Sequence, residues 1–491
     1  MGTLFKNGTV VTASDMVQAD VLVEGEKVVL IGQNLPTQGH EVINCEGKYL
    51  MPGGIDVHTH LDLPFGGTFS NDDFDVGHKA AAFGGTTMHI DFVNQPRGGS
   101  LHDGLVTWRE KAKPSQIDYG FHMIISDLRD DVMDEIPSLL DEGITTVKLF
   151  MAYKGVFQID DNTLYKAMQV AAKHGMIVMV HAENGDVEAQ LRSQLLAEGK
   201  TDPIYHYSSR PPEIEGEATN RAVVLAGLTG CHLYVVHVTC IPAIDALRRG
   251  RQLGYPVMGE TCVQYFHVTR DHHLGAPGFE GAKYVCSPPV RNEEHHQALW
   301  QAFKDDTLQA ISTDHCDFWY EGGVGPWQQW EKDHKGGQWA EYEKQDPTYR
   351  RPGKELGKGN FAKIPNGMPG IEDRMMVMWE LGVNSGKFSP SRFVELMSTN
   401  PAKIFGCYPQ KGTIAPATDA DIVVWDPNAK HTISASTHHM RCDYNVYEGM
   451  QVTGVPQQVY LRGKRIVDGN IWLGKNGEGK YVRRIPNAPV L

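Results

Sequence analysis

Two histidines one residue apart, His58 and His60, close a short apolar run that begins at Gly54. On an extended strand the side chains of residues i and i+2 point to the same side, so both imidazoles can bind one metal ion. Later apolar runs also end in, or contain, a single polar residue: Lys148, His181, His237 and Asp314. Polar groups at the ends of several core strands predict a metal site at one mouth of a barrel.

The chemistry that suits this set of residues is binding of a borderline divalent metal. Three or more imidazoles with a carboxylate are typical ligands of zinc or a similar ion. A single histidine at a strand end is more often a hydrogen-bonded structural residue. We interpret His89, His122 and His267 in that way, or as supports for ligands. A pattern repeated over five strands is much harder to explain by packing, so the set as a whole predicts metal binding.

Lys148 is the unusual member of the set, because it lies inside the apolar run Thr145–Phe150. A charged and unpaired lysine in a barrel core would cost several kcal/mol. Burial lowers the pKa of a lysine and favours the neutral amine. A neutral amine near two cations can add carbon dioxide and become a carbamate, a bidentate anion that would bridge two metals. The alternative is a structural lysine in a salt bridge.

The elements that must position these residues alternate between strand and helix over residues 53–400. The clearest helix is expected at 160–174, where Leu164, Met168 and Ala171 share one face, Asp160 or Asp161 caps the start and Gly175 ends it. Eight strands are expected, at residues 54–58, 86–92, 119–125, 145–150, 176–181, 233–238, 256–262 and 308–314. This alternation predicts an α/β fold, a (β/α)8 TIM-like barrel. An open doubly wound sheet is the alternative, but no Gly-x-Gly-x-x-Gly follows a strand, and no P-loop or Gly-x-Ser-x-Gly elbow is present.

Both ends of the chain read as short β-strands punctuated by glycine and asparagine. In the C-terminal part the strand-like segments are 421–425, 431–433 and 458–462. Neither end is long enough to form a robust sheet alone. We therefore expect residues 1–52 and 412–470 to pair into one small β-sandwich domain, with residues 53–411 as the barrel. The tail, residues 471–491, is a candidate for an oligomer contact.

Composition narrows the class of protein. The chain has 491 residues and a net charge of −14, and it shows no Lys/Arg cluster, which disfavours a nucleic-acid partner. No apolar run approaches the roughly 20 residues that span a bilayer, and the N-terminus does not resemble a signal peptide. The eight cysteines are scattered without a Cys-x-x-Cys pair, which predicts reduced thiols and a cytoplasmic location. Four of them are expected in core or near-site packing rather than in metal binding: Cys240, Cys262, Cys286 and Cys316.

Several motifs together carry a resemblance that runs nearly from end to end. They occupy residues 6–8, 51–60, 147–153, 287–289, 312–316, 364–367 and 419–426, among them Met-Pro-Gly-Gly-Ile-Asp-Val-His-Thr-His and Ser-Thr-Asp-His-Cys. The chain resembles the dihydropyrimidinase/D-hydantoinase family, the cyclic-amide hydrolases of the amidohydrolase superfamily. The resemblance implies hydrolysis of cyclic amide bonds. The expected substrates are 5,6-dihydropyrimidines such as dihydrouracil and dihydrothymine, 5-substituted hydantoins, or both, opened to N-carbamoyl amino acids.

The resemblance also implies roles for individual residues. Two divalent ions, expected to be Zn²⁺, would be held in each subunit, one by His58, His60 and Asp314 and the other by His181 and His237. Carbamylated Lys148 and a hydroxide would bridge them. Tyr153 resembles the family's oxyanion-stabilising phenol, and Asp314 would act as base and then acid. Backbone groups of Ser287 and Asn366 would hold the imide edge of the ring. Four apolar residues match positions that shape the pocket for the exocyclic group: Leu63, Phe65, Phe150 and Phe157. For Phe150, core packing is an equal alternative.

Other functions stay open beside this one. Dihydroorotase-like enzymes usually carry an arginine soon after the His-x-His pair, whereas Leu61-Asp62-Leu63-Pro64 follows here, which disfavours an anionic substrate. An allantoinase-like activity remains an alternative. So does a non-enzymatic scaffold of the dihydropyrimidinase-related kind, although all six ligand positions are present. Family resemblance implies a homotetramer or a dimer that acts on a small cyclic substrate, with no nucleic acid and no membrane.

One segment departs from the family pattern. Residues 318–351 form an apparent insertion that contains four of the nine tryptophans: Trp319, Trp327, Trp330 and Trp339. A long loop of this kind is usually functional or disordered, and its aromatic content argues against disorder. The segment predicts a folded flap near the pocket mouth or a subunit contact.

Overall fold

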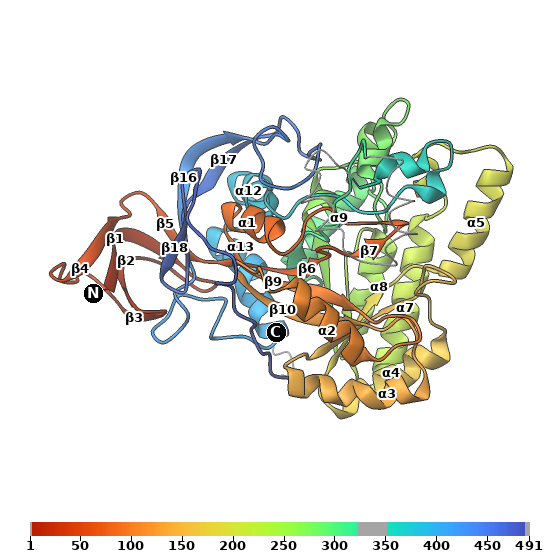
Figure 1. Cartoon of the computed structure of the whole chain (residues 1–491), viewed down its shortest axis with the longest axis horizontal. Helices are drawn as coiled ribbons and strands as arrows, with labels where there is room; N and C mark the ends of the chain where they lie inside the picture. The colour runs from red at the N-terminus through yellow and green to blue at the C-terminus, as the bar shows by residue number, and fades with distance from the viewer. Residues whose placement is uncertain (1, 323–350, 487–491) are drawn as a thin grey trace.

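A barrel of parallel strands lies at the centre of the molecule (Figure 1). The computed structural model describes residues 2–322 and 351–486. Eight strands form one sheet in the order β15-β14-β13-β12-β11-β10-β9-β6. Their bounds are β6 Gly54–Thr59, β9 Thr86–Asn94, β10 Asp118–Ile124, β11 Thr146–Phe150, β12 Ile177–His181, β13 His232–Val235, β14 Val257–Cys262 and β15 Ala310–Ser312. The predicted (β/α)8 barrel and its eight strands are confirmed.

The first and last strands close the barrel just beyond their ends. Thr59 and His315 form a parallel bridge. His60 N donates to His315 O at 2.8 Å, and Thr313 Oγ1 donates to the carboxylate of Asp56 at 2.7 Å. Closure therefore brings the segment after β6 beside the segment after β15.

Alternation along each strand decides which residues enter the barrel. On β11, Val147 and Leu149 belong to the apolar cluster that includes the helices, so Lys148 between them points inward. On β12, Val178 and Val180 face outward in the same way, and His181 therefore points inward. The inner apolar cluster contains residues of the opposite parity: Phe92, Phe150, Ile177 and Met179 among others.

Helices surround the barrel (Figure 1). The α-helices are α1 Val76–Phe83, α2 Leu101–Lys111, α3 Asp130–Glu135, α4 Asp161–Lys173, α5 Gly185–Ala197, α6 Tyr205–Ser208, α7 Pro212–Thr229, α8 Ile241–Gln252, α9 Glu293–Lys304, α12 Arg374–Met378, α13 Pro390–Val394 and α14 Asn400–Ile404. Short 3₁₀ or π segments are η1 Ile136–Glu142, η2 Val263–Phe266, η3 Arg270–Leu274, η4 Glu280–Tyr284, η5 Lys354–Gly357, η6 Phe361–Lys363, η7 Trp379–Asn384 and η8 Glu395–Thr399. Among the helices in the described part of the chain, none is long and apolar enough to cross a membrane.

Helix α4 confirms the helix predicted at 160–174. Asp160 caps it by accepting a hydrogen bond from Thr163 N at 2.8 Å. Leu164 and Met168 lie on its buried face, together with two alanines, and pack toward the barrel. Gly175 follows with a φ of +66°, a conformation that glycine adopts without strain.

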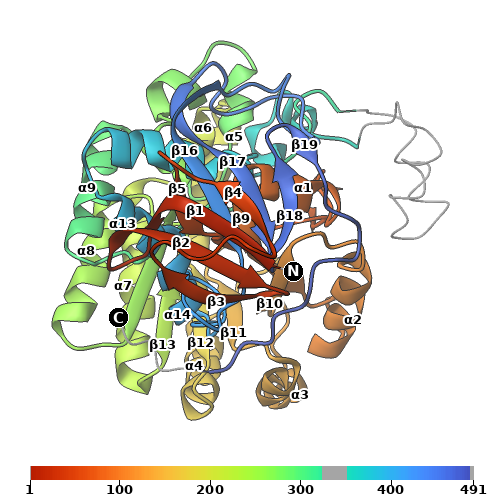
Figure 2. The same ribbon diagram turned by 90° about the vertical axis from the view of Figure 1, so that its left-hand side faces the viewer.

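The two chain ends meet in a second sheet, sheet A, which has nine strands. These are β1 Gly2–Val11, β2 Met16–Glu24, β3 Lys27–Gly32, β4 His40–Asn44, β5 Tyr49–Pro52, β16 Ile422–Thr432, β17 Gln451–Leu461, β18 Lys464–Asp468 and β19 Ile471–Trp472. The order is β19-β18-β17-β16-β5-β1-β2-β3, with β4 beside β1. Figure 2 looks onto this sheet with the barrel helices around and behind it. The predicted pairing of both ends is confirmed.

The central seam of sheet A joins residues far apart in the sequence. Strands β5 and β16 are antiparallel, with Leu50 opposite Val424. Both side chains lie in one buried cluster with residues of β1 and β2. The segments predicted separately at 421–425 and 431–433 are parts of one strand, because an irregularity between Asp426 and Lys430 preserves the pairing with β17.

A buried lysine connects sheet A to the barrel. Lys411 Nζ donates to Asp118 at 2.5 Å and to Asp421 at 2.6 Å, and it lies 3.0 Å from Asp419. Asp118 begins β10, whereas Asp421 immediately precedes β16. Burial opposes a charge here, but the three carboxylates outweigh burial and raise the pKa of Lys411. The cluster therefore holds the two sheets together through charge-assisted hydrogen bonds.

Replacing Lys411 with methionine is expected to lower the free energy of unfolding by about 3–5 kcal/mol, because the buried carboxylate of Asp421 loses the cation with which it pairs. Urea unfolding measures the change. Lys27→Met is the matched control. Lys27 also pairs with Asp419, but its side chain is 46% exposed, so its loss should cost less than about 1 kcal/mol. Equal losses for the two variants would contradict this account.

The described part of the tail packs on its own barrel. Gly479 N donates to Ser115 O at 2.9 Å, and Tyr481 forms a parallel bridge with Tyr119 of β10. Arg484 is buried and donates to the carbonyl of Phe121. The predicted oligomer contact of residues 471–491 stays a prediction, and residues 487–491 lie outside the described part.

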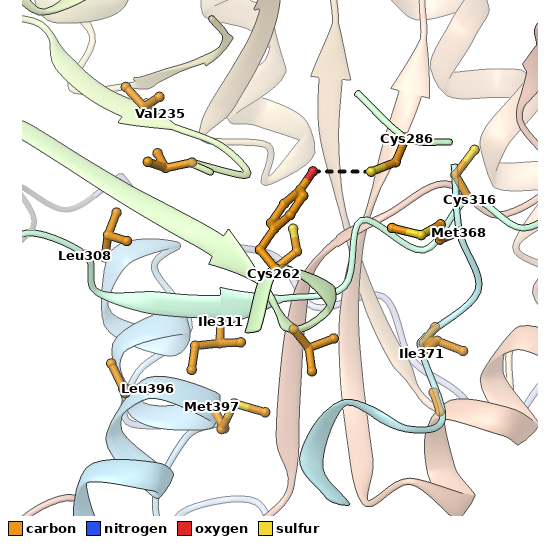
Figure 3. Close-up of a cluster of buried hydrophobic side chains, with 14 of the residues drawn as sticks. Val235, Cys262, Cys286, Leu308, Ile311, Cys316, Met368, Ile371, Leu396 and Met397 are labelled. Atoms are coloured by element: carbon orange, nitrogen blue, oxygen red, sulfur yellow. Dashed lines mark hydrogen bonds between the residues drawn. The ribbon is translucent and has the colours of Figure 1, made fainter. Parts of the chain in front are cut away.

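All eight cysteines are free and buried, whereas the sequence predicted a packed position for only four of them. Figure 3 shows Cys262, Cys286 and Cys316 among apolar side chains that include Met368 and Ile371. Tyr265 also lies there, with its hydroxyl 3.7 Å from the sulfur of Cys286. Core packing thus accounts for Cys262 and Cys286, while Cys316 additionally lines the pocket described next.

Candidate metal centre

A pocket at the mouth of the barrel gathers every residue that the sequence singled out for the site. It opens where the strands end, at the face of the barrel that carries the loops after β6, β11, β12, β13 and β15. Its lining comprises His58, His60, Leu63, Phe65, Lys148, Phe150, Tyr153, Phe157, His181, His237, Ser287, Asp314 and Asn366, together with Ile124 and Cys316.

One set of ligand atoms converges on the carboxylate of Asp314. Nε2 of His58 and Nε2 of His60 each lie 3.2 Å from its Oδ1. The Nε2 atom of His58 has no hydrogen-bond partner, although it is buried. Two imidazoles and a carboxylate that converge in this way fit a divalent metal ion.

A second set lies beside the first. Nδ1 of His181 and Nε2 of His237 are 3.0 Å apart. The ligand atoms of His58, His237 and Asp314 all lie within 4.8 Å of one another, so the two sets share one compact centre. This spacing fits a pair of metal ions better than a single ion, because five protein donors exceed what one four-coordinate zinc takes.

The protonation states also suit metal binding. Burial lowers the pKa of His58 and of His237 well below 6.5, so both imidazoles are neutral and keep a lone pair for a metal. Burial lowers the pKa of Lys148 to about 8. No carboxylate of the described residues lies within 4.0 Å of its Nζ, which lies over the rings of Phe92 and Phe150, 4.9 and 5.2 Å from their centroids. The salt-bridged alternative for Lys148 therefore finds no partner among the described residues.

Two buried glutamates behind the histidines escaped the sequence analysis. Nδ1 of His58 donates to Glu260 at 2.5 Å, and Glu260 also accepts from Tyr234 Oη at 3.1 Å. Nε2 of His181 lies 2.7 Å from Glu183. Each carboxylate engages one ring nitrogen, so that the other nitrogen of each ring faces the candidate metal centre. A signal for Glu260 was present, because it is an acid inside the apolar strand β14.

Burial raises the pKa of Glu260 to about 8, and its carboxyl group accepts from Nδ1 of His58 at 2.5 Å. Replacing Glu260 with glutamine is expected to weaken metal binding at His58 by about 10–100-fold, since a carboxamide supports the imidazole less strongly than the carboxyl group does. Competition with a chromogenic chelator measures the affinity. Tyr234→Phe is the matched control, because it removes a hydrogen bond to Glu260 but leaves the glutamate on His58. An affinity unchanged in Glu260→Gln would show that His58 needs no such support.

Three residues of the pocket have left-handed backbone conformations that are uncommon outside glycine. The φ angles are +64° at Tyr153, +41° at His237 and +51° at Asp314. Such conformations cost about 1–3 kcal/mol each and cluster at functional sites. Here they turn the chain sharply after β11, β13 and β15, so that the side chains face the pocket.

The far side of the pocket combines polar groups with aromatic rings. Asn366 Nδ2 donates to Ser287 Oγ at 3.1 Å. Burial raises the pKa of Tyr153, which keeps its phenol protonated and able to donate. The rings of Phe65, Phe150 and Phe157 lie with centroids 5.5, 5.9 and 6.3 Å from that of Tyr153. Beyond them the pocket continues into a larger cavity of about 820 Å³.

A second buried cluster of histidine and carboxylates does not fit a metal. Asp72, His315 and Asp317 place their ligand atoms close together. However, Nδ1 of His315 accepts from Gly370 N at 3.2 Å, so the ring proton sits on Nε2 and is donated to Asp72 at 3.2 Å. An Nε2 that carries a proton has no lone pair for a metal, and the cluster instead fixes the loop after β15.

The histidines interpreted as structural lie outside the pocket lining. His89 contacts Thr59 Oγ1 at 2.8 Å. His122 Nε2 donates to Val57 O at 3.1 Å, beneath the metal centre. His267 lies near His273, with ring centroids 5.6 Å apart.

The predicted insertion at 318–351 is described only at its two ends. Residues 323–350, with Trp327, Trp330 and Trp339, lie outside the described part, and so does the predicted flap. At the ends, Gly322 N donates to Glu355 at 3.1 Å, and Arg351 donates to Ser70 O at 2.8 Å.

Comparison with known proteins gives concordant results. The model of the amidohydrolase family matches residues 49–466. A D-hydantoinase of Geobacillus stearothermophilus is 48% identical over 486 residues, which cover 99% of this chain and 97% of that relative. A dihydropyrimidinase of Rattus norvegicus is 38% identical over 493 residues, covering 99% and 89%. The crystal structure of a dihydropyrimidinase from Brevibacillus agri superposes with a TM-score of 0.92 at 49% identity, covering 99% of both chains.

Proposed function

The chain belongs to the amidohydrolase family, among its hydantoinases and dihydropyrimidinases, and from this membership we propose how its pocket opens a ring. It is a hydrolase of cyclic amides. The proposed substrates are 5,6-dihydropyrimidines and 5-substituted hydantoins, and the products are N-carbamoyl amino acids. The observation that carries the proposal is the convergence in one pocket of five side chains suited to metal binding around a buried lysine that has no ion-pair partner among the described residues.

The family depends on two metal ions, and the donor set fits a pair. We propose that His58, His60 and Asp314 would hold one ion and His181 and His237 the other, and that Lys148, as a carbamate, would supply a ligand to both. Imidazole and carboxylate donors favour Zn²⁺. When bound, the pair would supply Lewis acidity and an activated water at neutral pH.

The side chains then have distinct tasks. Burial opposes ionisation of Asp314, but the contacts of its carboxylate with the ring nitrogens of His58 and His60 more than offset burial, so the pKa of Asp314 lies below the usual range. Asp314 is therefore a carboxylate that can take a proton from the attacking water and pass it to the leaving ring nitrogen. Tyr153 donates its phenolic hydrogen to the developing oxyanion.

The remaining lining selects and orients the substrate. Backbone groups of Ser287 and Asn366 hold the imide edge of the ring, facing the metal ligands. Leu63, Phe65, Phe150 and Phe157 form an apolar wall for the substituent on the ring, so alkyl and aryl groups suit it. A homotetramer in the cytoplasm is the proposed working form, by analogy with the family.

Ring opening of dihydrouracil and of 5-phenylhydantoin by zinc-loaded protein tests the proposal. Faster opening of dihydrouracil would support a dihydropyrimidinase, and preference for the arylhydantoin would indicate a hydantoinase. Opening of neither ring would contradict the proposal and favour allantoin or another cyclic amide. Protein that neither binds nor retains metal would instead favour a scaffold.

A further inference from the structure

Lys354, at the start of η5, is fully buried and donates to three backbone carbonyls. Its Nζ lies 3.0 Å from Val285 O, 2.7 Å from Pro365 O and 2.7 Å from Gly367 O. A lysine ammonium has three N–H donors and no acceptor, so this arrangement uses its whole capacity.

These carbonyls belong to the two loops that carry the polar side of the pocket. Val285 lies two residues before Ser287, and Pro365 and Gly367 lie on either side of Asn366. The same two loops are joined by a hydrogen bond from Gly367 N to Val285 O at 2.9 Å and by the contact of Asn366 with Ser287. Lys354 therefore lies behind the junction of the two loops, and its ammonium group binds the backbone of both.

The junction leaves little room for adjustment. A Cβ on Gly367 would lie 2.2 Å from Cys316 O, and the φ of Gly367 is +153°, so only glycine fits. Figure 3 shows Cys286, Cys316 and Met368 gathered in the apolar cluster at this place. Burying an ammonium among apolar side chains costs free energy, and burial accordingly lowers the pKa of Lys354 to about 7. The three hydrogen bonds to backbone carbonyls offset part of this cost and fix the ammonium at the junction of the two loops.

We propose that Lys354 is a positioning residue that sets the spacing between Ser287 and Asn366, and through it the grip on the imide edge of the substrate ring. The inference rests on the proposed function. Lys354 does not line the pocket and does not touch the metal ligands, so its effect should reach the substrate only through the two loops.

The kinetics of Lys354→Met with dihydrouracil test the inference, on full-length zinc-loaded protein. The KM is expected to rise by about tenfold or more, since each misplaced polar contact to a ligand is worth about that factor. The kcat should stay within about threefold, and the metal content should equal that of the wild type. Lys358→Met, an exposed lysine of the same segment, is the matched control and should leave both constants unchanged.

Two further variants keep the test decisive. Lys354→Gln retains two N–H donors, so its KM should fall between those of the wild type and Lys354→Met. In an Asn366→Ala background, Lys354→Met should change KM by a factor different from its factor in the wild type, because both residues hold the same junction. If Lys354→Met changes KM by the same factor in both backgrounds, the inference is overturned.

The possible failures are distinguishable. A wild-type chain that opens neither ring would overturn the proposed function and the role of Lys354 with it. An active wild type with an unchanged KM in the variants would overturn only the inference. Loss of metal in Lys354→Met, or failure of both Lys354 variants to fold, would assign the residue to stability of the fold and would also overturn it.

Discussion

Replacing Lys148 with alanine is expected to abolish ring opening, with a loss of kcat greater than about 10³-fold. This exceeds the effect of removing one oxyanion donor, about 10²–10³-fold, because the proposed carbamate would organise both metal ions. Alanine cannot form a carbamate, so the metal content should also fall below two ions per chain. Elemental analysis and the rate of dihydrouracil hydrolysis measure the two effects.

Two additional measurements make this result specific to Lys148. Lys173→Ala, at the exposed end of α4, is the matched control and should keep full activity. Short carboxylates such as propionate should restore part of the activity of Lys148→Ala, because they can occupy the vacated space as a bidentate anion. Full activity and two bound metals in Lys148→Ala would rule out a bridging role.

Replacing Asp314 with asparagine is expected to produce the second large effect. The kcat should fall by about 10³–10⁴-fold. A carboxamide has nearly the same shape but cannot take a proton at neutral pH, and general acid–base catalysis alone contributes about 10²–10⁴-fold. Weaker binding of the metal held with His58 and His60 adds to this loss. Steady-state kinetics at saturating Zn²⁺ separates the two contributions.

A buried acid away from the pocket provides the control. Burial raises the pKa of Asp373 to about 8, so this side chain is mostly protonated at neutral pH, and it accepts a hydrogen bond from Asn445 at 2.8 Å. Asp373→Asn should therefore leave kcat nearly unchanged. If both variants lose activity equally, the effect of Asp314→Asn comes from disruption of the fold rather than from loss of proton transfer.

Sequence patterns were most informative where local periodicity decides the direction in which a side chain points. Alternation along β11 and β12 directs Lys148 and His181 inward, and the i, i+2 spacing of His58 and His60 puts both on one side. These features depend only on residues adjacent in the chain. The strand ends could therefore be placed before the structure was known.

Other parts of the site depend on contacts between distant segments, which no local pattern records. Glu260 reaches His58 across 202 residues, and Lys354 reaches Val285 across 69. The positive φ of Asp314 is likewise not marked by any local pattern, although aspartate adopts this conformation more often than most residues. Ser287 and Asn366 could be named only through resemblance, since nothing in their own sequence context marks a substrate contact.

The seam of sheet A bears on the order in which the protein can fold during synthesis. Strands β1–β5 leave the ribosome first, but β5 pairs with β16, whose residues are made about 370 positions later. Until then the N-terminal strands present an unpaired edge, while the barrel can form behind them. A chain that stops before residue 422 would keep that edge open, so completion of the sheet distinguishes finished chains from truncated ones.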